Sequence, residues 1–286
     1  MKSMAFEACP CTPETQALGA ARHQTSSQPQ LRVALQGAEQ GVPVVMSHAL
    51  GLDMSLWDGL AEALAATHPV LRYDHRGHGG SARPPGPYTL EQLVDDAARV
   101  INEWGRGPVV FVGLSMGGMV GQGLAIKHPE LLRGLVLANT TSQYPSAAQD
   151  ALAQRIAAVE LGGMASVVDL VMGRYVHPDF VAAQPVRTAA LRAQVLRADP
   201  SSYVASCHAI RDVNWLADLP KLTLPTLVIA GARDVSTTPE MGEAIARAIP
   251  GAELKLLKDA SHLSLLEQPE QFESVLRDWL TRQQLD

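Results

Sequence analysis

Short apolar runs alternate with longer stretches of helical periodicity from Leu31 to the end of the chain. Runs of this kind, bounded by Gly or Pro, predict strands that are buried on both faces of a mostly parallel sheet. The predicted strands are Leu31–Leu35, Val42–Met46, Val70–Tyr73, Val109–Leu114, Leu135–Ala138, Leu227–Ala230 and Leu254–Leu257. The stretches between them predict helices over Ser55–Ala66, Leu90–Trp104, Met116–His128 and Glu240–Ile249. Because strands and helices alternate, the predicted fold class is α/β, with a right-handed, doubly wound sheet.

Residues 145–218 interrupt this alternation. They contain no strand-like run, and their apolar residues recur at helical spacing, as Leu152, Ile156 and Val159 do. We expect four short helices here. An insert between the strands of such a sheet lies over their carboxyl ends, where open α/β folds bind ligands. The predicted domains are a loose lead-in at residues 1–30, a core at residues 31–144 and 219–286, and a helical cap, or lid, at residues 145–218.

Composition places the chain among globular proteins, because hydrophobic residues make up 47% and charged residues 18%. The formal net charge of −6 disfavours a nucleic-acid partner, whose phosphates would repel this surface. No stretch approaches the ~18 apolar residues that cross a bilayer, and Pro10 and Pro13 interrupt any secretory signal. Cys9, Cys11 and Cys207 cannot form a disulfide framework. We expect a cytoplasmic protein that acts on a small molecule and has no membrane partner. The sequence is compatible with an oligomer.

The strongest local signal is the sequence Gly-Leu-Ser-Met-Gly at residues 113–117, directly after a predicted strand and directly before a predicted helix. A strand-to-helix turn this sharp needs small residues two positions before and two after its apex, because the backbone packs closely there. The side chain at the apex, Ser115, is then lifted clear of the sheet. We therefore interpret Ser115 as a candidate nucleophile.

A serine hydroxyl is a poor nucleophile unless a base takes its proton, and the base needs a carboxylate to fix its tautomer. Asp234 follows a predicted strand, in a loop at the carboxyl end of the sheet. His262 comes one helix and one strand later, just after the last predicted strand. The sequence therefore predicts a catalytic triad of Ser115, Asp234 and His262.

Acyl transfer also needs N–H donors that stabilise the oxyanion of the tetrahedral intermediate. We expect these to be the backbone N–H of Met116, at the amino end of a helix, and that of Leu50, in the loop after the second predicted strand. His48 in the same loop is interpreted as a structural residue.

The run Asp74–Ser81 mixes basic residues with glycines, but its glycine spacing is wrong for a dinucleotide-binding loop. We interpret it as a tight turn held by hydrogen bonds of Asp74 and Arg76. No cluster of Cys and His has the spacing of a metal site, so no metal and no cofactor are expected.

These motifs resemble those of the α/β-hydrolase superfamily over residues 31–284, and within it those of the 3-oxoadipate enol-lactonases of aromatic catabolism. The shared features are the Ser47–Gly51 loop followed by Trp57, the run Arg72–Thr89, the Gly113–Gly118 turn and the stretch Arg155–Glu160 in the insert. The resemblance implies the α/β-hydrolase fold with a helical lid, and no cofactor. It also implies that Ser115, Asp234 and His262 hydrolyse an enol-lactone to a 3-oxo dicarboxylic acid.

The chain departs from the enol-lactonases where the substrate is recognised. Those enzymes often carry a basic residue shortly after the strand Leu135–Ala138, where this chain has Gln143–Tyr144, and an Arg-Trp-Phe group in the lid, where it has Arg174–Val176. Losing a cation beside a carboxylate would weaken substrate binding by on the order of 1.5–3 kcal/mol. Arg174 remains as a candidate carboxylate anchor. The expected substrate contacts are Ala49, Tyr144, Arg174 and Leu263.

The expected activity is hydrolysis of a carboxylic ester or lactone through an acyl-enzyme. A broad carboxylesterase, a cofactor-free perhydrolase or a carbon–carbon bond hydrolase would use the same three residues and differ only in the pocket. A hydrolase-like ligand receptor keeps the fold while its triad erodes, so the intact triad argues against it. Ser115 excludes dehalogenases and epoxide hydrolases, which need Asp at this position.

Overall fold

The computed structural model describes residues 28–286. The lead-in expected at residues 1–30, including Cys9 and Cys11, therefore lies almost entirely outside the described residues. Within the described range, no helix is long and apolar enough to cross a membrane. The cytoplasmic location stays a prediction.

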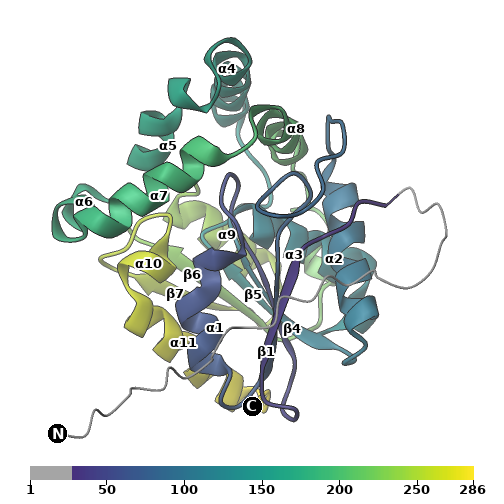
Figure 1. Ribbon diagram of the computed structural model, residues 1–286. Coiled ribbons are helices and arrows are strands. Elements are labelled where there is room, and N and C mark those ends of the chain that lie inside the picture. Colours follow the sequence, from purple (N-terminus) through teal and green to yellow (C-terminus); the bar gives the residue numbers. More distant parts are fainter. Residues whose placement is uncertain (1–27) are drawn as a thin grey trace, which may run out of the picture.

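A seven-stranded sheet forms the centre of the described structure, in the order β1-β3-β2-β4-β5-β6-β7 (Figure 1). β1 pairs antiparallel with β3, and all other neighbouring pairs in the sheet are parallel. The prediction of a mostly parallel, doubly wound sheet is confirmed. The strands are β1 (Val33–Gly37), β2 (Val44–Ser47), β3 (Pro69–Tyr73), β4 (Val109–Leu114), β5 (Leu132–Ala138), β6 (Thr226–Gly231) and β7 (Glu253–Leu257).

Helices cover both faces of the sheet (Figure 1). Helix α1 (Asp58–Leu64) packs against α11 (Pro269–Arg282) on one face. On the opposite face α2 (Leu90–Trp104) packs against α3 (Met116–Lys127), and α9 (Pro239–Ala248) also covers that face. The side chains of Trp57, Phe111 and Trp279 are fully buried in the layers between helices and sheet. The core helices are α1 (Asp58–Leu64), α2 (Leu90–Trp104), α3 (Met116–Lys127), α9 (Pro239–Ala248), α10 (Ser264–Glu267) and α11 (Pro269–Arg282).

Helix α2 shows why its bounds could be predicted. The Thr89 hydroxyl accepts a hydrogen bond from the backbone N–H of Gln92 at 3.2 Å, and the Gln92 side chain accepts one from the N–H of Thr89 at 3.1 Å. This reciprocal capping box satisfies two N–H groups that the helix itself cannot bond. At the other end Gly105 has a φ of 67°, a left-handed conformation that favours glycine and ends the helix.

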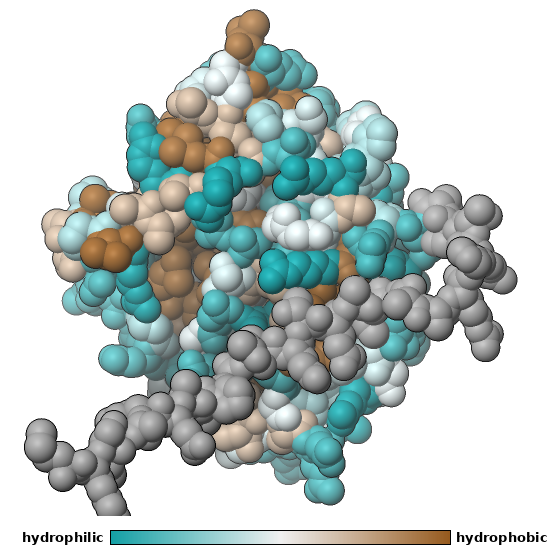
Figure 2. All heavy atoms as spheres, in the orientation of Figure 1, coloured by the Kyte–Doolittle hydropathy of each residue, from teal (hydrophilic) through white to brown (hydrophobic). Residues whose placement is uncertain are grey.

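The cap is an insert between β5 and β6, and its helices lie together above the carboxyl ends of the strands (Figure 1). It has five α-helices where four were expected, because the short helix that starts at Pro178 forms separately from its neighbours. Most of the large apolar side chains that are exposed in the described structure lie on this cap, and brown patches mark that part of the surface in Figure 2. The cap helices are α4 (Ser146–Gly162), α5 (Val168–Tyr175), α6 (Pro178–Ala183), α7 (Pro185–Arg197) and α8 (Pro200–Arg211).

The expectation that the strands are buried on both faces is wrong for β7. Leu254 and Leu256 on this strand are 37% and 53% exposed. β7 is one of the two edge strands of the sheet, so part of its surface has no neighbour to cover it. An apolar run alone does not distinguish an edge strand from a central one.

Candidate active site

Ser115 alone makes the turn between β4, which ends at Leu114, and α3, which begins at Met116. Its backbone has φ 57° and ψ −115°, a conformation that is strained for a residue with a Cβ atom. Glycines on either side permit the turn. A Cβ atom on Gly113 would lie 2.3 Å from the carbonyl oxygen of Gly117, and one on Gly117 would lie 2.1 Å from that of Ser47. The turn predicted from the sequence is present, with Ser115 at its apex.

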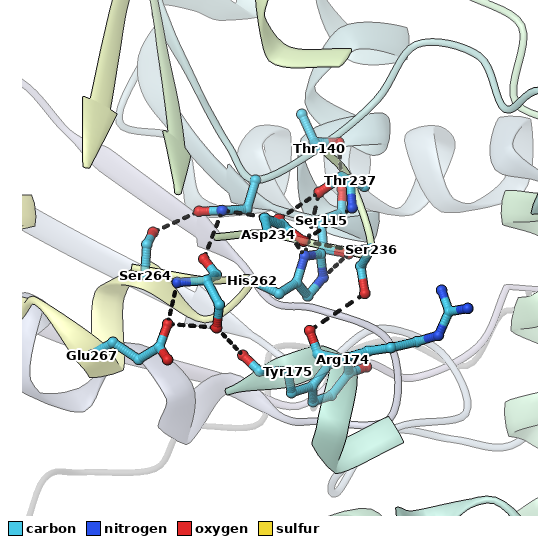
Figure 3. Close-up of polar contacts among 12 residues, drawn as sticks. Ser115, Thr140, Arg174, Tyr175, Asp234, Ser236, Thr237, His262, Ser264 and Glu267 are labelled. Atoms are coloured by element: carbon cyan, nitrogen blue, oxygen red, sulfur yellow. Dashed lines mark hydrogen bonds and ion pairs between the residues drawn. The ribbon is translucent and has the colours of Figure 1, made fainter. Parts of the chain in front are cut away.

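The structure brings Ser115, His262 and Asp234 together in one hydrogen-bonded chain (Figure 3). His262 Nε2 lies 2.9 Å from Ser115 Oγ, and His262 Nδ1 lies 2.8 Å from Asp234 Oδ2. Because a carboxylate accepts hydrogen bonds, the imidazole proton lies on Nδ1, and Nε2 is free to accept the proton of the serine hydroxyl. The three side chains come from the loops after β4, β6 and β7, all at the same edge of the sheet.

The Asp234 carboxylate is almost completely buried and accepts several further hydrogen bonds. The backbone N–H groups of Ser236 and Thr237 donate to Oδ1 at 2.7 and 3.1 Å, and the Asn139 side-chain amide donates to Oδ2 at 3.0 Å. Burial alone would raise the pKa of Asp234, but the charge of a protonated His262 and these donors outweigh burial and lower it. Asp234 is therefore held as a carboxylate that can stabilise an imidazolium.

The cap directly contacts the hydrogen-bonded series formed by Ser115, His262 and Asp234. The ring of Tyr175, at the end of α5, stacks on the His262 ring with centroids 5.5 Å apart, and its hydroxyl donates to the Leu50 carbonyl. Glu267 accepts hydrogen bonds from the backbone N–H of Ser261 at 2.5 Å and from that of His177, at the start of α6, at 2.6 Å. One carboxylate therefore joins the loop of His262 to the cap, and Figure 3 shows the contact of Glu267 with that loop.

The predicted oxyanion donors lie beside the serine. β2 and β4 are neighbours in parallel register, with Ser47 paired to Gly113, so the loops that follow them emerge together. Leu50 lies in the first of these loops and lines the same cavity as Ser115, and Met116 is the first residue of α3. The N–H at a helix start is a ready donor to a developing negative charge.

A cavity of about 40 Å³ lies between the core and the cap, with Ser115 and His262 in its wall. Of the predicted substrate contacts, Tyr144 and Arg174 line this cavity. Ala49 and Leu263 are completely buried and do not appear in its wall, so contact of these two with a substrate stays a prediction. The cavity has room for only a few water molecules.

Sequence reasoning missed Arg155 as a site residue. It projects from α4 into the same cavity and is only 9% exposed. The signal that could have found it is its place between Leu152, Ile156 and Val159, all buried on one face of the helix. A cation within an apolar helix face is unusual, because charged side chains are seldom fully buried.

The turn after β3 fastens the loops around the site. As expected, Asp74 holds it, with its carboxylate accepting from the N–H groups of Gly80 and Met54, each at 2.8 Å. Arg76 does not hold the turn through its side chain and instead forms an ion pair with Asp96 on α2, with a Nε–Oδ2 distance of 2.6 Å. Within residues 28–286, no group of three or more His, Cys, Asp or Glu side chains is placed to hold a metal ion.

Comparison with known proteins identifies the family. A family model described as the alpha/beta hydrolase fold matches residues 42–269. The chain belongs to the α/β hydrolase fold family. The fold expected from the sequence is thereby confirmed, and so is the hydrolase class at the level of the family.

The relatives of this hydrolase include the enzymes that the motifs resemble. It is 30% identical over 252 residues to 3-oxoadipate enol-lactonase 2 from Acinetobacter baylyi, covering 88% of this chain and 93% of that one. The crystal structure of the enol-lactonase from Burkholderia xenovorans LB400 is similar with a TM-score of 0.85, 34% identity and coverage of 88% and 97%. A thermophilic esterase from Thermogutta terrifontis also has a TM-score of 0.85, with 30% identity and coverage of 96% and 99%. The resemblance to enol-lactonases is confirmed.

Buried histidines hold the loop after β2 in this hydrolase. His48 donates from Nδ1 to the Ala49 carbonyl at 2.8 Å and accepts at Nε2 from the N–H of His75 at 3.0 Å. His78 Nε2 accepts from the N–H of Gly51 at 3.0 Å. Both rings must be neutral to accept in this way, and burial lowers the pKa of His48 to about 4 and that of His78 to about 3. His48 therefore has the structural part expected of it.

We predict that replacing Gly117 with alanine lowers the free energy of unfolding by about 1–3 kcal/mol, because the new methyl group must push the strand at Ser47 away. Urea denaturation of the hydrolase and the variant measures this difference. Gly173→Ala is the matched control, since Gly173 is exposed on α5 with nothing near a Cβ atom. This substitution should raise the free energy of unfolding by about 0.5–1 kcal/mol, because alanine favours the helix more than glycine does. A Gly117→Ala variant as stable as the unmodified protein would contradict the close packing described here.

We also predict that His48 makes the hydrolase less stable in acid. Its pKa is 6.5 in the unfolded chain and about 4 in the folded one, so the unfolded state binds the proton first. Stability is retained above pH 6.5 and lost as the pH falls from 6.5 to about 4, by on the order of 3 kcal/mol. Denaturant titrations at several pH values should show a flatter dependence for His48→Gln. A slope for His48→Gln equal to that of the unmodified protein would contradict this prediction.

Proposed function

We propose that the protein hydrolyses a carboxylic ester or lactone through an acyl-enzyme formed on Ser115. The observation that carries this proposal is the 2.9 Å separation of His262 Nε2 and Ser115 Oγ, with Asp234 behind the imidazole. This geometry is that of a nucleophile, a general base and an orienting carboxylate.

In the proposed reaction His262 takes the proton of Ser115 as the serine oxygen attacks the substrate carbonyl. The N–H groups of Leu50 and Met116 donate to the resulting oxyanion. His262 then gives its proton to the leaving oxygen, and the ester bond breaks. A water molecule activated by the same imidazole attacks the acyl-enzyme and releases the acid. Asp234 stays ionised throughout and stabilises the imidazolium.

The substrate that the relatives suggest is an enol-lactone whose hydrolysis yields a 3-oxo dicarboxylic acid. The enol-lactonase from Acinetobacter baylyi covers most of this chain, and the one from Burkholderia xenovorans LB400 has the same fold over most of its length. The cavity of about 40 Å³ is smaller than such a molecule, so the substrate enters when α4 and α5, which form part of its wall, move away from the core.

A broad esterase is the second candidate, because the Thermogutta terrifontis esterase matches more of this chain than the enol-lactonases do. Short 4-nitrophenyl esters and a carboxylated enol-lactone distinguish the two. An enol-lactonase should have the higher kcat/KM on the lactone, and a broad esterase the higher kcat/KM on the nitrophenyl esters.

Ser115→Ala tests the proposal itself. Removing the nucleophile should lower kcat by roughly 10⁴- to 10⁶-fold and leave thermal unfolding unchanged. A fluorophosphonate probe should label the unmodified protein and the variant Ser201→Ala, in which an exposed serine of α8 is replaced, but not Ser115→Ala. Turnover by Ser115→Ala above a few per cent would rule out this serine as the nucleophile.

A further inference from the structure

Arg155 is a buried cation without a counter-ion in the described structure. Its residue exposure is 9%, and its Nε atom is buried with no hydrogen-bond partner. Within residues 28–286, no ion pair links its guanidinium to an Asp or Glu side chain, although other buried arginines such as Arg76 have one. Burying a charge without a partner is strongly unfavourable, so this arrangement requires a reason.

The side chains around Arg155 do not neutralise it. The groups whose electrostatics it feels most strongly are Tyr203, Cys207 and Tyr175. All three are uncharged at neutral pH, because burial raises the pKa of each phenol and raises that of the Cys207 thiol to about 12. None of them supplies a negative charge, so the guanidinium keeps its positive charge.

A second cation lies at the same cavity. Arg174 on α5 lines it together with Arg155, and no described side chain forms an ion pair with Arg174. Its guanidinium points away from the chain of Ser115, His262 and Asp234 (Figure 3). The two arginines line one cavity, and the pKa of Arg174 is lowered by burial and further by the like charge of Arg155. An anion in the cavity would relieve this repulsion.

We propose that Arg155 binds a carboxylate group of the substrate and thereby selects charged esters or lactones over neutral ones; this inference rests on the proposed function. A guanidinium pairs with a planar carboxylate through two parallel hydrogen bonds. Arg155 and Ser115 line the same cavity, so a carboxylate held by the arginine keeps the rest of the substrate beside the nucleophile. Neutral substrates leave the buried cation unpaired and bind less well.

Two substrates of matched length test the proposal: mono(4-nitrophenyl) glutarate, which carries a carboxylate, and 4-nitrophenyl pentanoate, which carries a methyl group in its place. We compare the unmodified protein with Arg155→Met and Arg155→Lys. Arg155→Met should lower kcat/KM on the glutarate ester by about 10- to 100-fold, through a higher KM, and change it less than threefold on the pentanoate. Arg155→Lys should recover part of the loss. Arg187→Met, at an exposed arginine of α7, removes the same charge and should change neither substrate.

Equal losses on both substrates, or no loss on either, would overturn the role of Arg155 while turnover by the unmodified protein still supports the proposed function.

Binding of the glutarate dianion, measured by isothermal titration calorimetry, gives a second readout that needs no turnover. The unmodified protein should bind glutarate, and Arg155→Met should bind it at least tenfold more weakly. Binding of inorganic phosphate but not of glutarate, or equal glutarate binding by both proteins, would refute the proposal. If neither ester is hydrolysed but glutarate binding follows Arg155, the proposed function fails and the carboxylate site stands.

Discussion

Close approach of backbone segments at the carboxyl ends of β4 and β6 is the constraint on which the site depends. Gly113 and Gly117 let β4, α3 and the loop after β2 meet, and Gly231 does the same where β6 meets the loop of His262. A Cβ atom on Gly231 would lie 2.3 Å from the Ser261 carbonyl oxygen. Without this contact the imidazole could not lie within hydrogen-bonding distance of both its partners, because a displacement of one ångström is enough to break such a bond.

Residues of both the cap and the core form the site. The core supplies Ser115, His262 and Asp234, and fixes them through buried hydrogen bonds around Asp234 and the histidines of the loop after β2. The cap supplies Tyr175, which covers His262, and two arginines, which give the cavity its charge. The residues proposed for chemistry and those proposed for substrate selection therefore come from different parts of the chain, so one set can change without the other.

The elements that the sequence predicted best are those with a local signal. Helix α2 has its own capping box, and β4 is an unbroken apolar run that ends at a glycine-flanked serine. The helix Pro269–Arg282 was missed, although Phe272, Leu276 and Trp279 recur along it at helical spacing behind a proline at its start. The exposure of β7 could not be read from its residues, because only the order of strands in the sheet makes it an edge.

By itself the sequence determined the alternation of strands and helices and the sharp turn at Ser115, because both are set by neighbouring residues. It also determined the order of serine, acid and histidine, because that is the order of the chain itself. Only the tertiary structure decided that His262 lies 2.9 Å from Ser115 and that Arg155 faces the same cavity. Those facts join residues far apart along the chain, and their separation in space follows from how the strands pair and how the cap folds back over them. Helical periodicity shows which face of α4 is buried, but not what that face is buried against.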